Sequence, residues 1–173
     1  MTLRSFLSTF AAPIALGLGL LWAWERARSQ KHKVTPIDPN DPLWKSAIQH
    51  ASDTIPLMRE LFSQYGTEMQ VKYPLTTDSG QIEHVWGQLI SLDASTMTVT
   101  LATQPINAVS ARPPFGIPLA DIEDWQFVSS NGQVRGGFTT QAQIAIAKKT
   151  GSSIPPHIAE SESKFVDRLP IAT

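Results

Sequence analysis

The stretch "QIEHVWGQLI", residues Gln81–Ile90, decides how the chain is interpreted, because it predicts a β-strand and carries an adjacent glutamate and histidine. Successive side chains of a strand point to opposite faces of a sheet. His84 therefore shares a face with Ile82 and Trp86, and Glu83 lies on the opposite face. The alternation predicts that Glu83 and His84 do not act together on one substrate atom.

One face of this segment carries an apolar set, Ile82, Trp86 and Ile90, in phase with His84. We therefore expect Trp86 to be largely buried, with His84 packed beside it and hydrogen-bonded to a neighbouring strand. Trp125, in a later predicted strand, is expected to be buried as well. The alternative for His84 is a histidine that contacts a ligand.

The sequence on both sides of this segment alternates with a period of two, which predicts further strands. Met69, Val71 and Tyr73 alternate with polar residues, and residues 95–102 ("STMTVTLA") alternate in the same way. Residues 117–129 hold two apolar stretches. The Asn-Gly pair in "SNGQ" predicts a hairpin whose return strand is "VRGGF".

Two short helices are predicted ahead of the strands. Asp41 is a suitable N-cap for a helix over "LWKSAIQHAS", with Pro42 in its first turn. Pro56 interrupts the helical pattern, because a proline inside a helix removes a backbone donor and clashes with the preceding turn. A second helix is therefore expected, capped by Asp53 or Thr54.

A last helix is predicted through "QAQIAIAKK", capped by Thr139 or Thr140 and closed by Gly151. The residues that follow it, including "IPPHIAESESK", lack a period. We expect them to form a mobile tail over residues 151–173.

Helices followed by a run of antiparallel strands define the α+β fold class. We expect an interrupted N-terminal helix packed on a small, strongly twisted antiparallel sheet, with a partly closed barrel as the alternative for the sheet. The α+β domain is predicted over residues 43–150. A linker rich in proline and aspartate is predicted over residues 34–42.

The first 33 residues differ in composition from the rest of the chain. Phe6–Trp24 is 19 residues long and carries no charge; a helix of that length rises roughly 28 Å, close to the thickness of a bilayer's hydrocarbon core. Residues 1–33 are predicted to be an uncleaved signal-anchor, one transmembrane helix with a basic flank. A cleaved secretory signal and a buried core helix are the alternatives, and no small-residue cleavage site follows the apolar run.

The basic residues beside this helix predict its orientation. Arg4 precedes the predicted helix, whereas Arg26, Arg28, Lys31 and Lys33 follow it. Because positively charged flanks are retained on the cytoplasmic side, we expect the folded domain to be cytoplasmic. The alternative is a periplasmic domain, including one secreted after signal cleavage.

Composition and motifs exclude several functions. A net charge of -1 offers no basic surface for nucleic acid, and the absence of cysteine excludes disulfides, thiolate metal sites and a cysteine nucleophile. No Gly-x-Ser-x-Gly motif and no phosphate-binding loop is present, and we expect no cofactor. The four histidines are scattered without ligand spacing, so no metal site is expected: His32, His50, His84 and His157.

Four separated blocks carry a resemblance to a known family: "VKYP", "EHVWGQLI", "DIEDWQFV" and "GGFT". In order and spacing they resemble the bacterial DUF2314 (YegJ-like) family, over roughly residues 43–147. The resemblance implies the boundaries of the domain, and it implies that the membrane in question is the bacterial inner membrane. It implies little about chemistry, since the family is defined by a domain of unknown function.

Two regions besides the predicted strand at Gln81–Ile90 hold candidate binding residues. Asp124 and Trp125 are adjacent in "DIEDWQFV", where an acid in a cleft is weighed against an aspartate in a turn or cap. The proline-rich loop over residues 104–118 is either a rigid connection or a preorganised contact surface. The candidate binding residues are His84, Trp86, Arg112, Phe115, Asp124 and Trp125.

The sequence favours a membrane-tethered, non-enzymatic interaction module that binds a protein partner and is attached through Phe6–Trp24. The alternative is a small enzyme that uses His84 with Asp124 or Glu83 brought from different strands. The two functions differ in whether polar groups converge on one concave site.

Overall fold

The computed structural model describes residues 37–170. The predicted anchor at Phe6–Trp24, its basic flank and the start of the linker lie outside the described residues. Within residues 37–170, no helix combines the length and the hydropathy that crossing a membrane requires.

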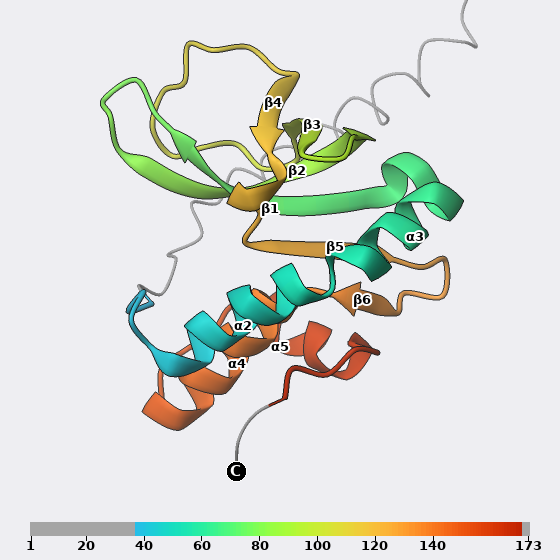
Figure 1. The fold of residues 1–173 in the computed structure, drawn as a ribbon. Coiled ribbons are helices and arrows are strands. Elements are labelled where there is room, and N and C mark those ends of the chain that lie inside the picture. The colour runs from blue at the N-terminus through green and yellow to red at the C-terminus, as the bar shows by residue number, and fades with distance from the viewer. Residues whose placement is uncertain (1–36, 171–173) are drawn as a thin grey trace, which may run out of the picture. The chain divides into compact units, whose positions relative to one another are not determined.

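Two consecutive helices open the described chain, as predicted. Helix α2 spans Pro42–Asp53 and α3 spans Ile55–Tyr65 (Figure 1). Two more helices follow the strands, α4 at Phe138–Thr150 and α5 at Pro156–Ser161. Short 3₁₀ turns are η1 at Gly66–Glu68, η2 at Leu119–Asp121 and η3 at Glu162–Lys164.

The strands form one antiparallel sheet in the order β4-β3-β2-β1-β5-β6. Their bounds are Met69–Thr76 for β1, Ile82–Leu92 for β2, Thr96–Leu101 for β3, Phe115–Pro118 for β4, Asp124–Val128 for β5 and Val134–Gly136 for β6. The α+β class and the predicted hairpin between β5 and β6 are confirmed.

The sheet is open, so the alternative of a partly closed barrel is wrong. Closure would require the two terminal strands, β4 and β6, to pair with each other. The outer edge of β6 is instead occupied by the C-terminal segment, where Val134 forms a parallel bridge with Phe165. β4 is only four residues long and begins and ends beside prolines, which cannot donate to a further strand.

The break between α2 and α3 is made by Thr54. Its hydroxyl donates to the carbonyl oxygens of His50 and Ala51 at 2.8 and 3.1 Å, which satisfies the last turn of α2. At the other end of α2, Asp41 is the expected N-cap, because its carboxylate accepts a hydrogen bond from the Leu43 N–H. Both ends of α2 thus follow from local contacts. Thr54 also occupies the expected N-cap position of α3, but its side chain makes no capping hydrogen bond to that helix.

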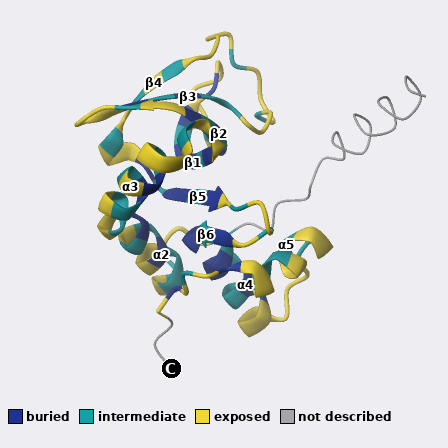
Figure 2. Ribbon diagram, turned by 90° about the vertical axis from the view of Figure 1, so that its right-hand side faces the viewer, coloured by how far each residue is buried: buried dark blue, intermediate teal, exposed yellow. Residues whose placement is uncertain are grey.

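The hydrophobic core lies between one face of the sheet and helices α2, α3 and α4. Met69, Val71 and Tyr73 alternate into it from β1, and Trp125 and Phe127 join them from β5; all five are at most 5% exposed. Figure 2 shows the buried positions gathered where these strands meet the helices. The helix residues buried in this core are Ala47, Ala51, Met58, Leu61, Phe138 and Ala142.

The core side of β2 is the opposite of the one expected. Val85 and Leu89 are buried, whereas Ile82 is 62% and Ile90 is 41% exposed. Trp86 is only partly buried, so the expectation that it belongs to the core is wrong. The reason is the register with β1: Val85 lies opposite buried Tyr73, which puts Val85, Gly87 and Leu89 on the core side. The register with β3 shifts between Leu89 and Ser91, so beyond Ile90 it is Leu92 that packs against the core.

Gly87 explains how the aromatic ring of Tyr73 fits against β2. A Cβ atom at Gly87 would lie 2.8 Å from Tyr73 Cε1 and 2.8 Å from the Thr100 carbonyl oxygen. A side chain at this position would therefore push the ring or the neighbouring strand away. The absence of a side chain at Gly87 leaves room for the Tyr73 ring beside β2 and β3.

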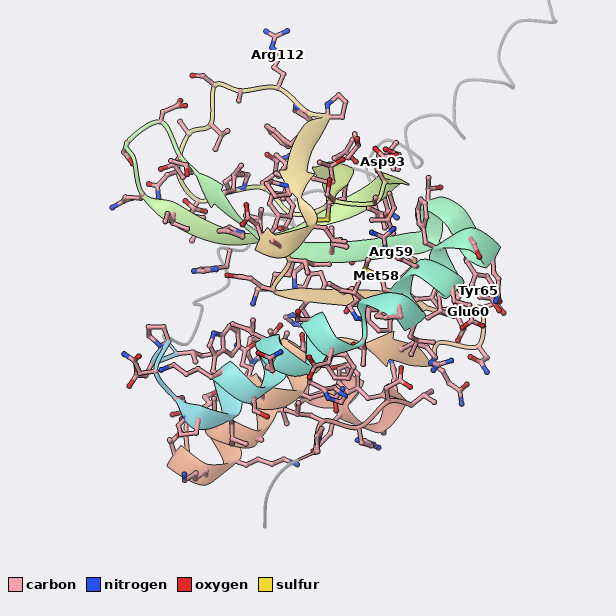
Figure 3. All side chains as sticks on the ribbon, viewed as in Figure 1. Met58, Arg59, Glu60, Tyr65, Asp93 and Arg112 are labelled. Atoms are coloured by element: carbon pink, nitrogen blue, oxygen red, sulfur yellow. The ribbon has the colours of Figure 1, made fainter. Side chains whose placement is uncertain are left out.

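The segment predicted as a loop over residues 104–118 ends in a strand. Residues 115–118 form β4, and Phe115 pairs with Val99 of β3 and packs against the core. Arg112 is exposed in the loop before β4, at the point farthest from the helices in Figure 3. Arg59 of α3 fastens the other end of β3, because its guanidinium donates to the Asp93 and Ala94 carbonyl oxygens at 2.7 Å.

The C-terminal segment is folded against the domain, in contrast to the expected mobile tail over residues 151–173. Phe165 and Leu169 are each only 5% exposed, and helix α5 precedes them. Burying these two apolar side chains stabilises the docked segment. The segment has no helix or strand period, so its sequence did not indicate that these residues are buried. The compact domain therefore continues beyond residue 150 and includes the described residues to 170.

Candidate functional site

Strands β2, β1 and β5 bring one row of side chains together on the side of the sheet opposite to Val71 and Trp125. Lys72 of β1 is the cross-strand partner of Trp86 on β2 and of Asp124 on β5. Directly opposed residues of neighbouring strands point to the same face, with Cβ atoms about 5 Å apart. We call this surface the outer face; its residues are Lys72, Pro74, Ile82, His84 and Trp86.

Lys72 lies at the centre of the outer face. Its Nζ lies 4.5 Å from the ring centroid of Trp44, which projects from α2. Burial lowers the pKa of the Lys72 ammonium below its ordinary value, while the charges of Glu123 and Asp124 act in the opposite direction. Among residues 37–170, no side chain or carbonyl oxygen accepts a hydrogen bond from this Nζ.

His84 is held by an acidic side chain from a different segment. Its Nδ1 lies 2.8 Å from both carboxylate oxygens of Glu123, the second residue before Trp125. The His84 side chain is 52% exposed and that of Glu123 is 15% exposed. When Nδ1 carries the proton and donates to Glu123, Nε2 is left as an acceptor available to a ligand.

Asp124 caps helix α4 from a distant strand. Its carboxylate accepts from the Phe138 N–H at 3.1 Å and from both the N–H and the hydroxyl of Thr139 at 2.7 Å. Complete burial raises the pKa of Asp124 to about 6, although the hydrogen bonds from Thr139 and Trp125 and the charge of Lys72 lower it. An anion at a helix N-terminus is favourable, because free N–H groups converge there.

The expected cap of this helix is therefore wrong. Thr139 lies inside α4, which begins at Phe138, and the N-cap position is Gly137, which has no side chain to donate or accept. Gly136 and Gly137 have φ of 73° and 68°. Two successive residues with positive φ turn the chain sharply from β6 into α4 and direct its first N–H groups to Asp124.

Glu83 and His84 point to opposite faces, as expected. The Glu83 carboxylate accepts from the Ile106 and Asn107 N–H groups at 2.7 and 2.8 Å, and from the Asn107 side chain at 2.7 Å. Glu83 thus fastens the loop between β3 and β4 and does not contact His84. A Glu83–His84 pair is not available for catalysis in this geometry.

The six candidate residues do not form a single site. His84 and Trp86 lie on the outer face, and Asp124 is Lys72's neighbour there but is fully buried beneath the start of α4. Trp125 lies in the core, where its Nε1 donates to Thr54 at 3.1 Å. Arg112 and Phe115 belong to the loop and to β4, far along the sheet from β5.

The sequence did not single out Lys72 of the outer face, nor Trp44 and Glu123, which contact Lys72 and His84. Lys72 and Glu123 stand inside the blocks "VKYP" and "DIEDWQFV" that carry the family resemblance. The alternation in β1 puts Lys72 on the polar face of that strand. It does not say which strands pair with β1, so the neighbours of Lys72 could not be predicted. Only the register of β1 with both β2 and β5 brings Lys72 to Trp86 and Glu123 to His84.

No group of three His, Asp or Glu side chains within residues 37–170 is arranged to hold a metal ion. The Asp124 carboxylate has all its near contacts with backbone and hydroxyl donors. The chemistry available on the outer face is therefore hydrogen bonding by His84, the positive charge of Lys72 and the apolar surface of Trp86.

These features define a class of protein: a small α+β domain with an open antiparallel sheet. Helices pack on the face that holds Val71 and Trp125, and α2 and α4 also contact Lys72 and Asp124 on the other face. The rest of that other face, on β1 and β2, presents a mixed polar and aromatic surface. The family model described as "Uncharacterized protein conserved in bacteria (DUF2314)" matches residues 41–149. The chain belongs to this family, and the resemblance drawn from its four blocks is confirmed. Neither the curated proteins nor the solved structures contain a match.

Proposed function

We propose that the chain is a membrane-tethered binding module and that a protein partner docks on the outer face of the sheet. The observation that carries this proposal is that β2 turns Ile82, His84 and Trp86 away from the core. Ile82 and Trp86 flank His84 on the side away from the core, and Ile82 is 62% exposed. Apolar side chains grouped with a polar rim are typical of interaction surfaces, whereas isolated exposed apolar residues are ordinary.

The polar residues of the same face supply specificity. The Lys72 ammonium has an aromatic neighbour and no hydrogen-bond acceptor within residues 37–170, so an acceptor on a partner would satisfy it. His84 is already oriented by Glu123, which reduces the entropy lost when its Nε2 binds. A partner contact here would combine an aromatic anchor with two directed polar groups.

A crosslinking experiment tests this proposal. A photo-crosslinking residue placed at Ile82 or Trp86 is expected to capture one defined protein from solubilised membranes. Ile106 provides a matched control, because it is 77% exposed but lies in the β3–β4 loop. Capture of the same protein from position 106, or no capture from either outer-face position, would contradict docking on the outer face.

Membrane tethering rests on the uncharged run at Phe6–Trp24 and the basic residues after it. The chain should remain in the membrane pellet through carbonate washing. Because the sequence contains no cysteine, a single cysteine at exposed Ser163 reports the side of the membrane without background. We expect it to be shielded from an impermeant thiol reagent in intact cells; labelling there would place the domain in the periplasm.

A second candidate, a small enzyme, is favoured by one contact. A carboxylate that holds one imidazole nitrogen leaves the other free to act as a general base, and Glu123 holds His84 in this way. The catalytic partner would thus be Glu123 in place of Asp124 or Glu83. Incubation with a metabolite extract tests it: a compound consumed by the wild type and spared by His84→Gln would favour catalysis.

A further inference from the structure

The outer edge of β6 and the first turn of α4 hold the C-terminal segment by contacts typical of peptide recognition. Phe165 forms a parallel bridge with Val134, and the Val166 N–H donates to the Val134 carbonyl oxygen at 2.9 Å. Adding an extended segment to a free sheet edge uses main-chain hydrogen bonds for affinity and side-chain contacts for specificity. One bridge and one further main-chain hydrogen bond join the segment to β6, and the chain then bends at residues 166–167 and reaches α4 at Leu169.

Two residues of the segment, Asp167 and Leu169, make specific contacts with β6 and α4. The Asp167 carboxylate accepts two-pronged hydrogen bonds from the Arg135 guanidinium at 2.9 and 3.0 Å, and a third from the Gly136 N–H at 3.1 Å. Leu169 is buried in the main core, and its N–H donates to Gln141 Oε1 at 2.9 Å. A bidentate arginine–carboxylate pair adds direction as well as energy.

Phe165 fills a space that a glycine leaves open. A Cβ atom at Gly137 would lie 2.7 Å from Phe165 Cε1, so no other residue fits there while the ring is in place. Phe165 packs with Val134 and Ile144 in a small cluster of its own. The recognised pattern is therefore an aromatic residue, any residue, aspartate, any residue and leucine.

The receptor and its ligand belong to different parts of the chain. Val134, Arg135, Gly137 and Gln141 lie within the family match, which ends at residue 149, whereas residues 165–169 lie beyond it. The link between them begins at Gly151 and Ser152, which are exposed. In Figure 2 helix α5 lies beside β6 at the edge of the domain, away from α2 and α3.

From these contacts we infer that the β6 edge and the start of α4 form a recognition site for peptide segments of the form aromatic-x-Asp-x-Leu on a partner protein. The chain's own residues 165–169 occupy this site and compete with the partner. A tethered competitor acts at an effective concentration in the millimolar range, so the partner binds only where the tail is displaced. This site is separate from the outer face and does not depend on the function proposed for it.

The test uses the full chain with a protease recognition sequence inserted between Gly151 and Ser152. After folding and cleavage, a fluorescent peptide of residues 162–170 ("ESKFVDRLP") is titrated and its anisotropy is measured. We expect it to bind the cleaved chain at least about 100-fold more tightly than the uncleaved chain, because cleavage removes the tethered competitor. A peptide carrying Asp167→Asn should bind about 10-fold more weakly, and one carrying Val166→Ser, which alters a side chain of a residue that is 48% exposed, should bind unchanged.

A second variant keeps the inference testable without cleavage. In the uncleaved chain, Asp167→Asn weakens the tail's own hold, so this variant should bind the wild-type peptide more tightly than the uncleaved wild type does. Unfolding on cleavage, equal binding of the wild-type and Asp167→Asn peptides, or no gain in the uncleaved variant would each overturn the inference. Tail exchange between two copies, seen as a dimer that no peptide displaces, would assign the site to self-association and also overturn it.

Discussion

Two tryptophans that the sequence presents alike lie in opposite environments. Trp125 of β5 is 0% exposed, packs edge-on against Phe138 at a centroid distance of 5.9 Å and donates its Nε1 to Thr54. Trp86 of β2 is partly buried on the outer face, with Lys72 as its cross-strand partner. The comparison shows that aromatic content and alternation identify a strand but do not say which of its faces the helices cover.

The largest expected effect tests the core side of this comparison. Trp125→Ala should lower the free energy of unfolding by about 3–5 kcal/mol, because it leaves a large cavity and removes the hydrogen bond to Thr54. Urea denaturation followed by circular dichroism measures this loss. If Trp86→Ala costs as much as Trp125→Ala, the two faces do not differ as the structure indicates.

Asp124 sharpens the comparison, because it points to the outer side and yet is fully buried. Its pKa is raised to about 6 by burial, above an ordinary value of 3.8. A raised folded-state pKa contributes stability that is complete below about pH 4 and is lost as pH rises through about 6. The wild type should therefore gain up to about 3 kcal/mol between pH 7 and pH 4 relative to Asp124→Asn.

Unfolding by urea at several pH values, with Asp124→Asn as the control, isolates this group from the other titrating residues. Lys72 is the positive charge that faces Asp124, and burial lowers the pKa of its ammonium while the charges of Glu123 and Asp124 raise it. Parallel pH profiles for the two proteins would show that Asp124 titrates near its ordinary value.

A smaller effect tests the distant cap of α4. Thr139→Val keeps the shape of the side chain but removes the hydroxyl that donates to Asp124 at 2.7 Å, and it should cost about 1–2 kcal/mol. Thr140→Val is the matched control, since this neighbouring threonine lies in the same turn and is only partly buried. Equal thermal shifts for the two variants would contradict the cap.

The smallest expected effect on stability comes from the outer face itself. Trp86→Ala should cost about 1 kcal/mol or less, because the side chain is outside the core. The same variant should abolish crosslinking to the partner from position 82. A variant that is both fully stable and fully able to bind would remove Trp86 from the interaction surface.

Local sequence signals predicted much of the architecture. Asp41, Pro42 and Thr54 mark helix ends through capping chemistry between residues close in the chain, and "SNGQ" marks a turn in the same way. The membrane anchor at Phe6–Trp24 stays a prediction, because it lies outside the described residues. The four family blocks predicted the extent of the family match, 41–149, to within a few residues, but not the packing of the C-terminal segment that follows it.

The sequence by itself determined the order of the helices and strands apart from β4 and α5, the opposite orientation of Glu83 and His84, and the family, because each depends on residues that are near neighbours. Only the tertiary structure decided which face of β2 is buried, that Asp124 caps α4 and that Phe165 and Leu169 dock the C-terminal segment. These outcomes depend on strand register and on contacts between residues far apart in sequence. Their energy comes from burying apolar surface against whichever element folds beside it, and no local pattern specifies that neighbour.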